Sequence, residues 1–120
     1  MKSTLALTLA DLLLVEVAAG FTKEKGTITG GNYAMGTVLA KVTGKFQQLN
    51  PGGTGAAKVS FAVLGEDVDA SAADAPGVVI PRGAVVDADL LIWPAGITDP
   101  QKATALTELE TRGVVARVAL

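Results

Sequence analysis

The stretch LIWPAGITDPQKATALTELETRG, residues 91–113, decides much of the fold. Its second half predicts a helix over 99–112. Asp99 suits an N-cap, Pro100 suits the first helical position because it lacks an N–H, and Gly113 is a natural C-terminal stop. We expect this helix to bury a narrow apolar stripe formed by Ala103, Ala105, Leu106 and Leu109.

Trp93, the only tryptophan, stands before Pro94 just ahead of this helix. In one interpretation a strand ends at the tryptophan, its ring covers the base of the helix, and Pro94 forces the turn. In the other, Trp93 contacts another protein, since aromatic residues are enriched at interface hot spots. The closeness of the helix favours the first interpretation.

Short apolar runs separated by Gly, Pro and Asn precede residue 91. Three examples are 36–42, 57–64 and 84–93, which are rich in Val, Ile, Leu and Thr, as strands are. The last run predicts a strand on which Asp87 and Asp89 point to the same exposed face. We therefore predict an α+β fold, with a small, mostly-β body of short strands and one C-terminal helix.

The N-terminal segment has no single predicted conformation. Three of its leucines alternate with other residues at the spacing of a strand, while the run at 10–19 could equally form a short helix. The polar stretch GFTKEKG, residues 20–26, is bracketed by glycines and indicates a linker. We predict a flexible N-terminal arm and linker over 1–26 and a domain over 27–120.

This segment also begins somewhat like a secretory signal. Asp11 and Glu16 interrupt the region that would have to be apolar, which disfavours a signal. The same two charges exclude a membrane-spanning helix, which needs about 20 mostly apolar residues. We expect no membrane partner.

Composition removes several classes of function. The 120 residues contain no cysteine and no histidine, which excludes thiolate metal sites and the commonest general base. The net charge is −2, without a run of basic residues, so nucleic acid is not an expected partner.

Motif searches also fail. The glycine-rich GGTGAAKVS lacks the Gly-Lys-Ser/Thr ending of a phosphate loop. Asp67, Asp69 and Ser71 are spaced like the start of a calcium loop, but Ala72 and Val78 stand where glycine and glutamate are required. The sequence predicts no enzyme, no metal and no cofactor.

The landmarks in order resemble the head decoration protein family of lambda-like tailed phages. The resemblance runs from about Thr27 to the C-terminus, and its most specific pieces are GTVLAKV, VLGEDVDASAAD and LIWPAGITDPQKATALTELETRGVV. It implies a trimer-forming subunit that binds the major capsid protein outside the expanded head, at three-fold and quasi-three-fold positions. Such a protein stabilises the shell against packaged DNA and reaches the virion surface from the host cytoplasm during assembly.

Family members contact the capsid through an N-terminal arm that orders on the shell. Here the arm is expected to add a strand to the capsid lattice, with alternate side chains filling apolar pockets. Trp93 and Pro94 are then either a structural plug or a subunit contact. The predicted capsid-contact residues are Leu5, Leu7, Leu9, Leu12 and Leu14.

Two other classes of function stay open at this point. A secreted or surface-exposed small β-rich binding module would explain the leading apolar segment. A small carboxylate-dependent enzyme would require a deep pocket lined by Asp67, Asp69 or Asp87.

Overall fold

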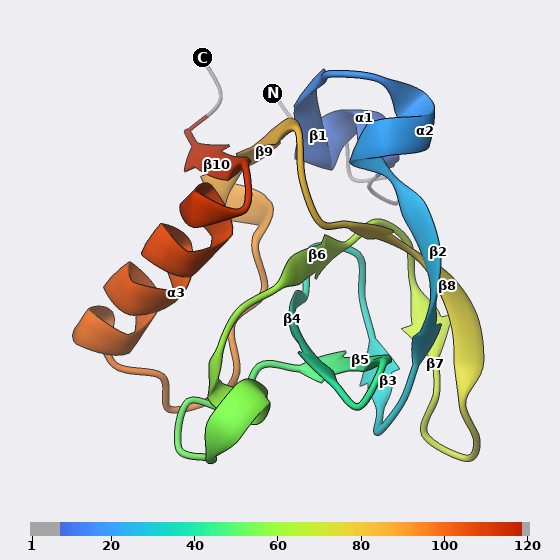
Figure 1. The fold of residues 1–120 in the computed structure, drawn as a ribbon, viewed down its shortest axis with the longest axis vertical. Helices are drawn as coiled ribbons and strands as arrows, with labels where there is room; N and C mark the ends of the chain where they lie inside the picture. The colour runs from blue at the N-terminus through green and yellow to red at the C-terminus, as the bar shows by residue number, and fades with distance from the viewer. Residues whose placement is uncertain (1–7, 119–120) are drawn as a thin grey trace.

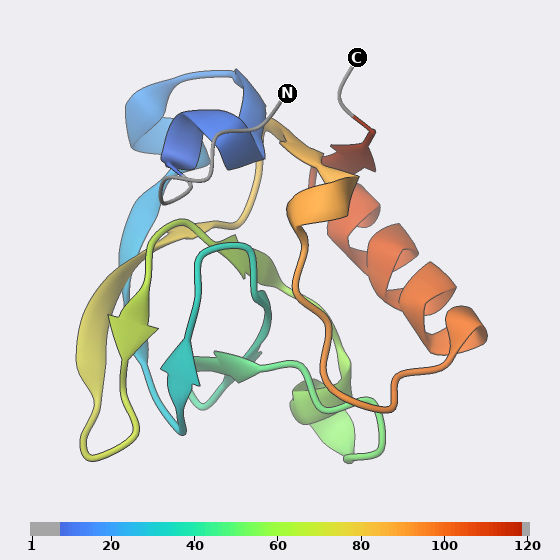
Figure 2. The same ribbon diagram turned by 180° about the vertical axis from the view of Figure 1, so that it is seen from behind.

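A closed five-stranded barrel and a three-stranded sheet make up the core of the protein in the computed structural model, which describes residues 8–118 (Figure 1). Helix α3 lies beside the sheet, and the N-terminal elements lie over one end of the barrel (Figures 1 and 2). The elements in chain order are α1 (Leu9–Leu12), β1 (Leu13–Glu16), α2 (Ala19–Thr22), β2 (Glu24–Ile28), β3 (Asn32–Tyr33), β4 (Val38–Val42), β5 (Lys45–Gln48), the 3₁₀ helix η1 (Gly55–Lys58), β6 (Ala62–Leu64), β7 (Val68–Asp69), β8 (Ala75–Ile80), β9 (Ala84–Asp87), the 3₁₀ helix η2 (Ala88–Leu90), α3 (Asp99–Thr111) and β10 (Val114–Arg117).

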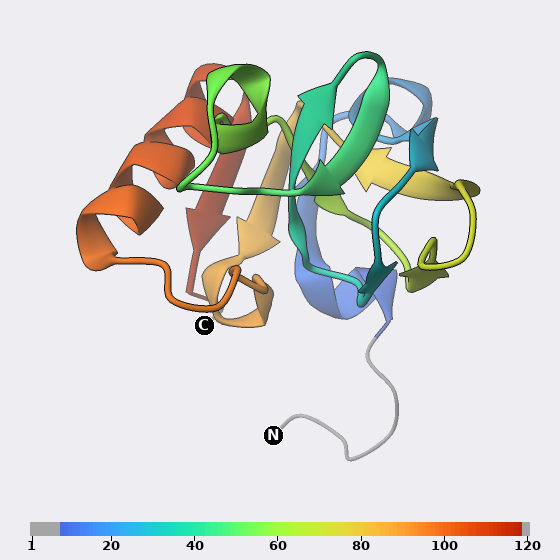
Figure 3. The same cartoon turned by 90° about the horizontal axis from the view of Figure 1, so that it is seen from below.

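Two barrel strands, β4 and β6, have consecutive buried residues and so separate two apolar cores. The barrel closes in the order β2-β5-β4-β6-β8. Along β4, Leu39 packs into the barrel interior, while Val38 and Ala40 pack into a second cluster that includes residues of α3. Because successive side chains of a strand point to opposite faces, one strand supplies both cores. Figure 3 shows α3 beside β10, with the barrel on the far side of β9.

Helix α3 confirms the predicted helix to within one residue at its C-terminal end. Its apolar stripe buries Ala105 and Leu109 against the second core with Leu106 packed beside them, whereas Ala103, expected in this stripe, is exposed. The N-cap is Thr98, not Asp99 as expected. Its hydroxyl accepts a hydrogen bond from the amide of Gln101 at 3.3 Å, and the Gln101 side chain accepts one from the Thr98 amide at 2.9 Å. This reciprocal capping box moves the cap one residue upstream.

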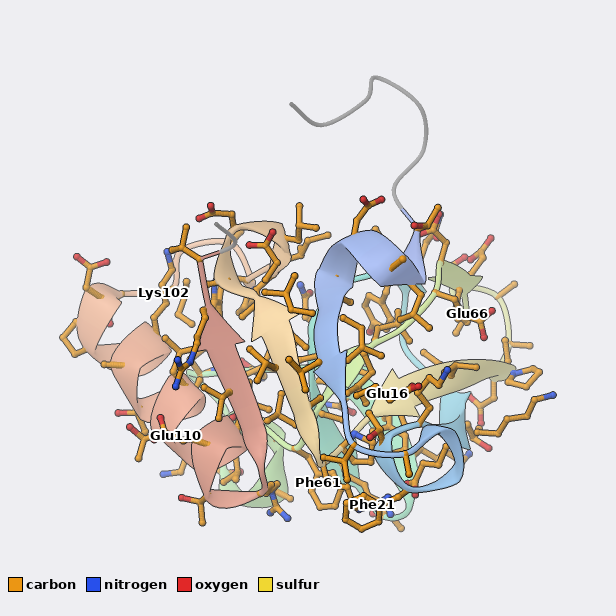
Figure 4. All side chains as sticks on the ribbon, turned by 90° about the horizontal axis from the view of Figure 1, so that it is seen from above. Glu16, Phe21, Phe61, Glu66, Lys102 and Glu110 are labelled. Carbon is orange, nitrogen blue, oxygen red and sulfur yellow. The ribbon has the colours of Figure 1, made fainter. Side chains whose placement is uncertain are left out.

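The three-stranded sheet has β9 at its centre. β1 pairs with β9 antiparallel, and β10 pairs with β9 in parallel. Figure 4 looks onto this sheet, with α3 flanking β10. The registers align Val15, Val85 and Val115 in one row across the three strands. A β-bulge between Leu13 and Val15 interrupts the side-chain alternation of β1.

The prediction of a linker over 20–26 is wrong, because this stretch forms the end of α2 and much of β2. β2 pairs with β8, and Gly26 lies opposite Gly77. A Cβ atom at Gly26 would lie 2.6 Å from the Phe46 ring, so the glycine lets the strand pass over a core aromatic side chain. The functional division into residues 1–26 and 27–120 stays a prediction.

The predicted strand over 84–93 is also too long. β9 ends at Asp87, whose carboxylate accepts a 3.0 Å hydrogen bond from the amide of Asp89 and so caps η2. Asp87 is buried rather than exposed on a strand edge. The hydrogen bond between the Asp87 side chain and the backbone competes with the strand pairing that would extend β9.

The described chain is compact and mostly β with a C-terminal helix, which confirms the predicted α+β class. No helix within residues 8–118 is both long enough and apolar enough to cross a membrane.

Candidate functional site

Apolar side chains are exposed along the first strand and the loop that follows it. Val15 is 53% exposed and Val17 is 68% exposed, while Leu14, at the bulge, is 38% exposed. Val15 continues the row formed by the half-buried Val85 and Val115. We call this surface the outer apolar face, defined by Leu14, Val15, Val17, Val85 and Val115.

Thr22 fixes the segment that carries this face. Its side chain is fully buried, and its hydroxyl accepts hydrogen bonds from the amides of Val17 at 3.1 Å and Ala18 at 3.3 Å. The same hydroxyl donates to the Gly83 carbonyl at 2.9 Å. The Val17 amide also donates to Gly83, at 3.0 Å. One threonine therefore fastens the turn after β1 to the residue that precedes β9.

Leu12 and Arg82 also hold the N-terminal segment on the rest of the protein. Leu12 is 0% exposed and belongs to the core cluster that contains Leu109. Arg82 donates to the Phe21 carbonyl at 2.8 Å and pairs with the Glu24 carboxylate at 3.0 Å. The outer apolar face is thus presented on a fixed support.

The predicted capsid-contact leucines have different environments. Leu5 and Leu7 lie outside the described residues. Leu9 opens α1 and packs against the core, so it is not in a strand. Leu12 is fully buried, and Leu14 is exposed. The missed local signal for α1 is the capping box in which the Asp11 carboxylate accepts from the Thr8 amide at 2.8 Å.

Trp93 is partly buried and packs against the core cluster that contains Ala105 and Leu109. Pro94 is half-buried beside it in the chain. This packing is what the core interpretation expects. A role for either residue in contact between subunits stays a prediction.

The acidic loop at 65–77 is locally organised. Asp67 accepts from the Met35 amide at 2.8 Å, and Glu66 accepts from the Val78 amide at 2.8 Å. Hydrogen bonding from the Ser71 hydroxyl lowers the pKa of Asp69, and Lys45 lowers the pKa of Asp74. The lowered pKa values favour the charged forms of Asp69 and Asp74.

No arrangement typical of catalysis or metal binding emerges within residues 8–118. No three metal-ligating side chains in that range gather at one point. Asp67 and Asp69 lie on the acidic loop, whereas Asp87 caps η2, so the three do not line one pocket. The larger clefts of the described chain are lined by other residues.

Sequence reasoning missed most of the outer apolar face. It named Leu14 but not Val15, Val17, Val85 or Val115. The bulge hides the alternation of β1, and the sheet register cannot be read from β9 or β10 alone.

Comparison with known proteins gives one match over most of the chain. Residues 3–114 match the family model described as Bacteriophage lambda head decoration protein D. No curated protein matches the chain.

Proposed function

Because the chain belongs to the bacteriophage lambda head decoration protein D family, we propose that it binds as trimers to the outside of the expanded phage head. The trimers occupy three-fold and quasi-three-fold positions and contact the major capsid protein. There they stabilise the shell against the pressure of packaged DNA. The family itself supports the capsid decoration role and a place on the virion.

The outer apolar face is the observation that carries the proposed contact with the shell. Its exposed valines follow directly in sequence after the N-terminal residues for which capsid contact is predicted. Apolar side chains on a rigid sheet bind without a large loss of conformational entropy. We propose that this face and the N-terminal arm form one continuous capsid-binding surface.

The arm contributes in two ways in this proposal. Leu5 and Leu7 reach the capsid lattice, Leu9 does so where α1 leaves the core, and Leu14 contacts the lattice from the outer apolar face. Leu12 is an anchor in the isolated subunit, and it contacts the capsid only where the segment leaves the core. Three such arms on one trimer raise the overall affinity, since later contacts become intramolecular.

Thermal release of DNA tests the stabilising role. DNA-filled heads that lack the decoration protein are heated with and without the purified protein, and free DNA is followed by a dye. The proposal predicts release at a higher temperature when the protein is present. An unchanged release temperature at saturating protein would contradict it. Bovine serum albumin at equal concentration controls for crowding.

A further inference from the structure

A cleft of about 570 Å³ lies between α2, the residue before β6 and the end of α3. Its lining includes Phe21, Phe61, Arg82, Glu108 and Arg112. We call it the Arg–Phe cleft. Figure 4 shows Phe21 and Phe61 next to each other, contributed by segments far apart in the chain.

The two arginines have different partners. Arg82 lies over the Phe21 ring, 5.5 Å from its centre, and its charge is balanced by Glu24. Arg112 stacks on Phe61 with its guanidinium carbon 3.9 Å from the ring centre. Within residues 8–118, no carboxylate lies within 4 Å of the Arg112 nitrogens.

A stacked guanidinium has one face on the ring and its N–H groups directed outward in its own plane. That geometry suits bidentate binding of a carboxylate. Lys41 adds a second cation 5.1 Å from the Phe61 ring centre, in an adjoining cleft that Arg112 also lines. One acid, Glu108, also lines the Arg–Phe cleft, and its carboxylate accepts a hydrogen bond from the Ser60 amide at 3.1 Å. The cleft therefore fits a segment that carries both carboxylates and small apolar groups.

The acidic loop of this chain has that chemistry. Asp69 and Asp74 flank two exposed alanines, Ala72 and Ala73, and the charged form of both aspartates is favoured. The loop does not line the cleft of its own subunit, and Figure 4 shows Glu66, at the start of the loop, well away from Phe61. A contact between loop and cleft must therefore join two copies.

We propose that the Arg–Phe cleft binds the acidic loop of a second copy of this chain, with Arg112 paired to Asp69 or Asp74 of that copy. The two surfaces differ, so the contact is head-to-tail, and such contacts close into rings. With three copies the ring closes as the trimer, a step that rests on the proposed function. Aromatic residues and arginine are the side chains most enriched at interface hot spots.

Disulfide trapping tests this contact, and the absence of native cysteine gives a clean background. Thr111→Cys places a thiol on the cleft, and Ala72→Cys places one on the acidic loop. After oxidation, the double variant is expected to give covalent species of up to three copies and no more. Mixing the two single variants should link position 72 of one copy to position 111 of another, identified by mass spectrometry.

Charge exchange is a second experiment on the same contact. Arg112→Glu and Asp69→Lys are each expected to weaken self-association by about tenfold, and the double exchange is expected to recover most of it. Circular dichroism confirms that each variant folds. Lys102→Glu, in the first turn of α3 and so at the opposite end of the helix from Arg112, is the control and should leave self-association unchanged (Figure 4).

Both experiments, disulfide trapping and charge exchange, are run on concentrated free protein and on expanded heads, with head binding measured separately. Absence of the 72–111 link in both settings would overturn the inference, whatever the head-binding result. If Arg112→Glu abolishes head binding but no link between copies forms, the cleft instead binds the capsid protein. The inference then fails while the proposed function stands. Failure of the unmodified protein to bind heads is a separate result and counts against the proposed function alone.

Discussion

The Thr22 hydroxyl donates a 2.9 Å hydrogen bond to the carbonyl of Gly83, a residue 61 positions away in the chain. It joins the N-terminal segment to the start of the central strand of the sheet. Substitution Thr22→Val should lower the free energy of unfolding by about 1–3 kcal/mol, because the backbone groups that are hydrogen bonded to the Thr22 hydroxyl lose that partner. Urea denaturation measures the change. Thr27→Val, at an exposed position, should stay within about 0.5 kcal/mol of the original, and equal losses would contradict the anchoring role.

Leu12 and Leu14 should respond oppositely to the same substitution. Leu12→Ala should cost about 2–5 kcal/mol of stability, because it leaves a cavity in a closed core. Leu14→Ala should cost less than about 1 kcal/mol, since that side chain is exposed. It should instead weaken binding to expanded heads. Thermal denaturation and co-sedimentation measure the two effects. A stability loss for Leu14→Ala as large as for Leu12→Ala would show that β1 is not placed as described.

Charge on the outer apolar face should weaken shell binding without unfolding the protein. Val17→Asp places a carboxylate where an apolar contact is proposed, and desolvating it should weaken head binding by roughly tenfold or more. The side chain is 68% exposed, so the free energy of unfolding should barely change. Ala103→Asp, exposed on α3, is the matched control. Normal head binding by Val17→Asp would exclude this face from the interface.

Acid titration should reveal the pairing of Asp74 with Lys45. The pair lowers the pKa of Asp74 in the folded protein. Its contribution to stability is therefore present above the unfolded pKa of about 3.9 and is lost as the pH falls through the lower folded value. Lys45→Met should raise the pKa of Asp74 toward about 3.9 and leave that of Asp69 unchanged. NMR titration of the carboxyl carbons measures both, and an unchanged Asp74 would contradict the pairing.

Local signals predicted the elements whose patterns are complete within a few residues. α3 carries Pro100 near its start, Gly113 after its end and an apolar stripe, so its bounds could be read directly. β4 was also recognisable, because it lies in the apolar run at 36–42 that begins with a glycine. These segments decide the fold class.

The N-terminal segment depends on contacts with distant parts of the chain. The polar β2 is held by its pairing with β8, and Gly26 is needed because Phe46 lies against it. The anchoring role of Thr22 depends on its hydrogen bond to the distant Gly83, which the sequence around Thr22 does not indicate. The candidate surface likewise depends on the register that aligns Val15 with Val85 and Val115. Such pairings between remote segments cannot be predicted from local periodicity.

Co-sedimentation with capsid shells tests the central claim most directly. Purified protein is mixed with expanded empty heads of a lambda-like tailed phage and with unexpanded shells as the control. We expect saturable binding to the expanded heads alone, at one copy per capsid subunit. Absence of binding to expanded heads, or equal binding to both forms, would contradict the claim that this protein decorates the mature shell.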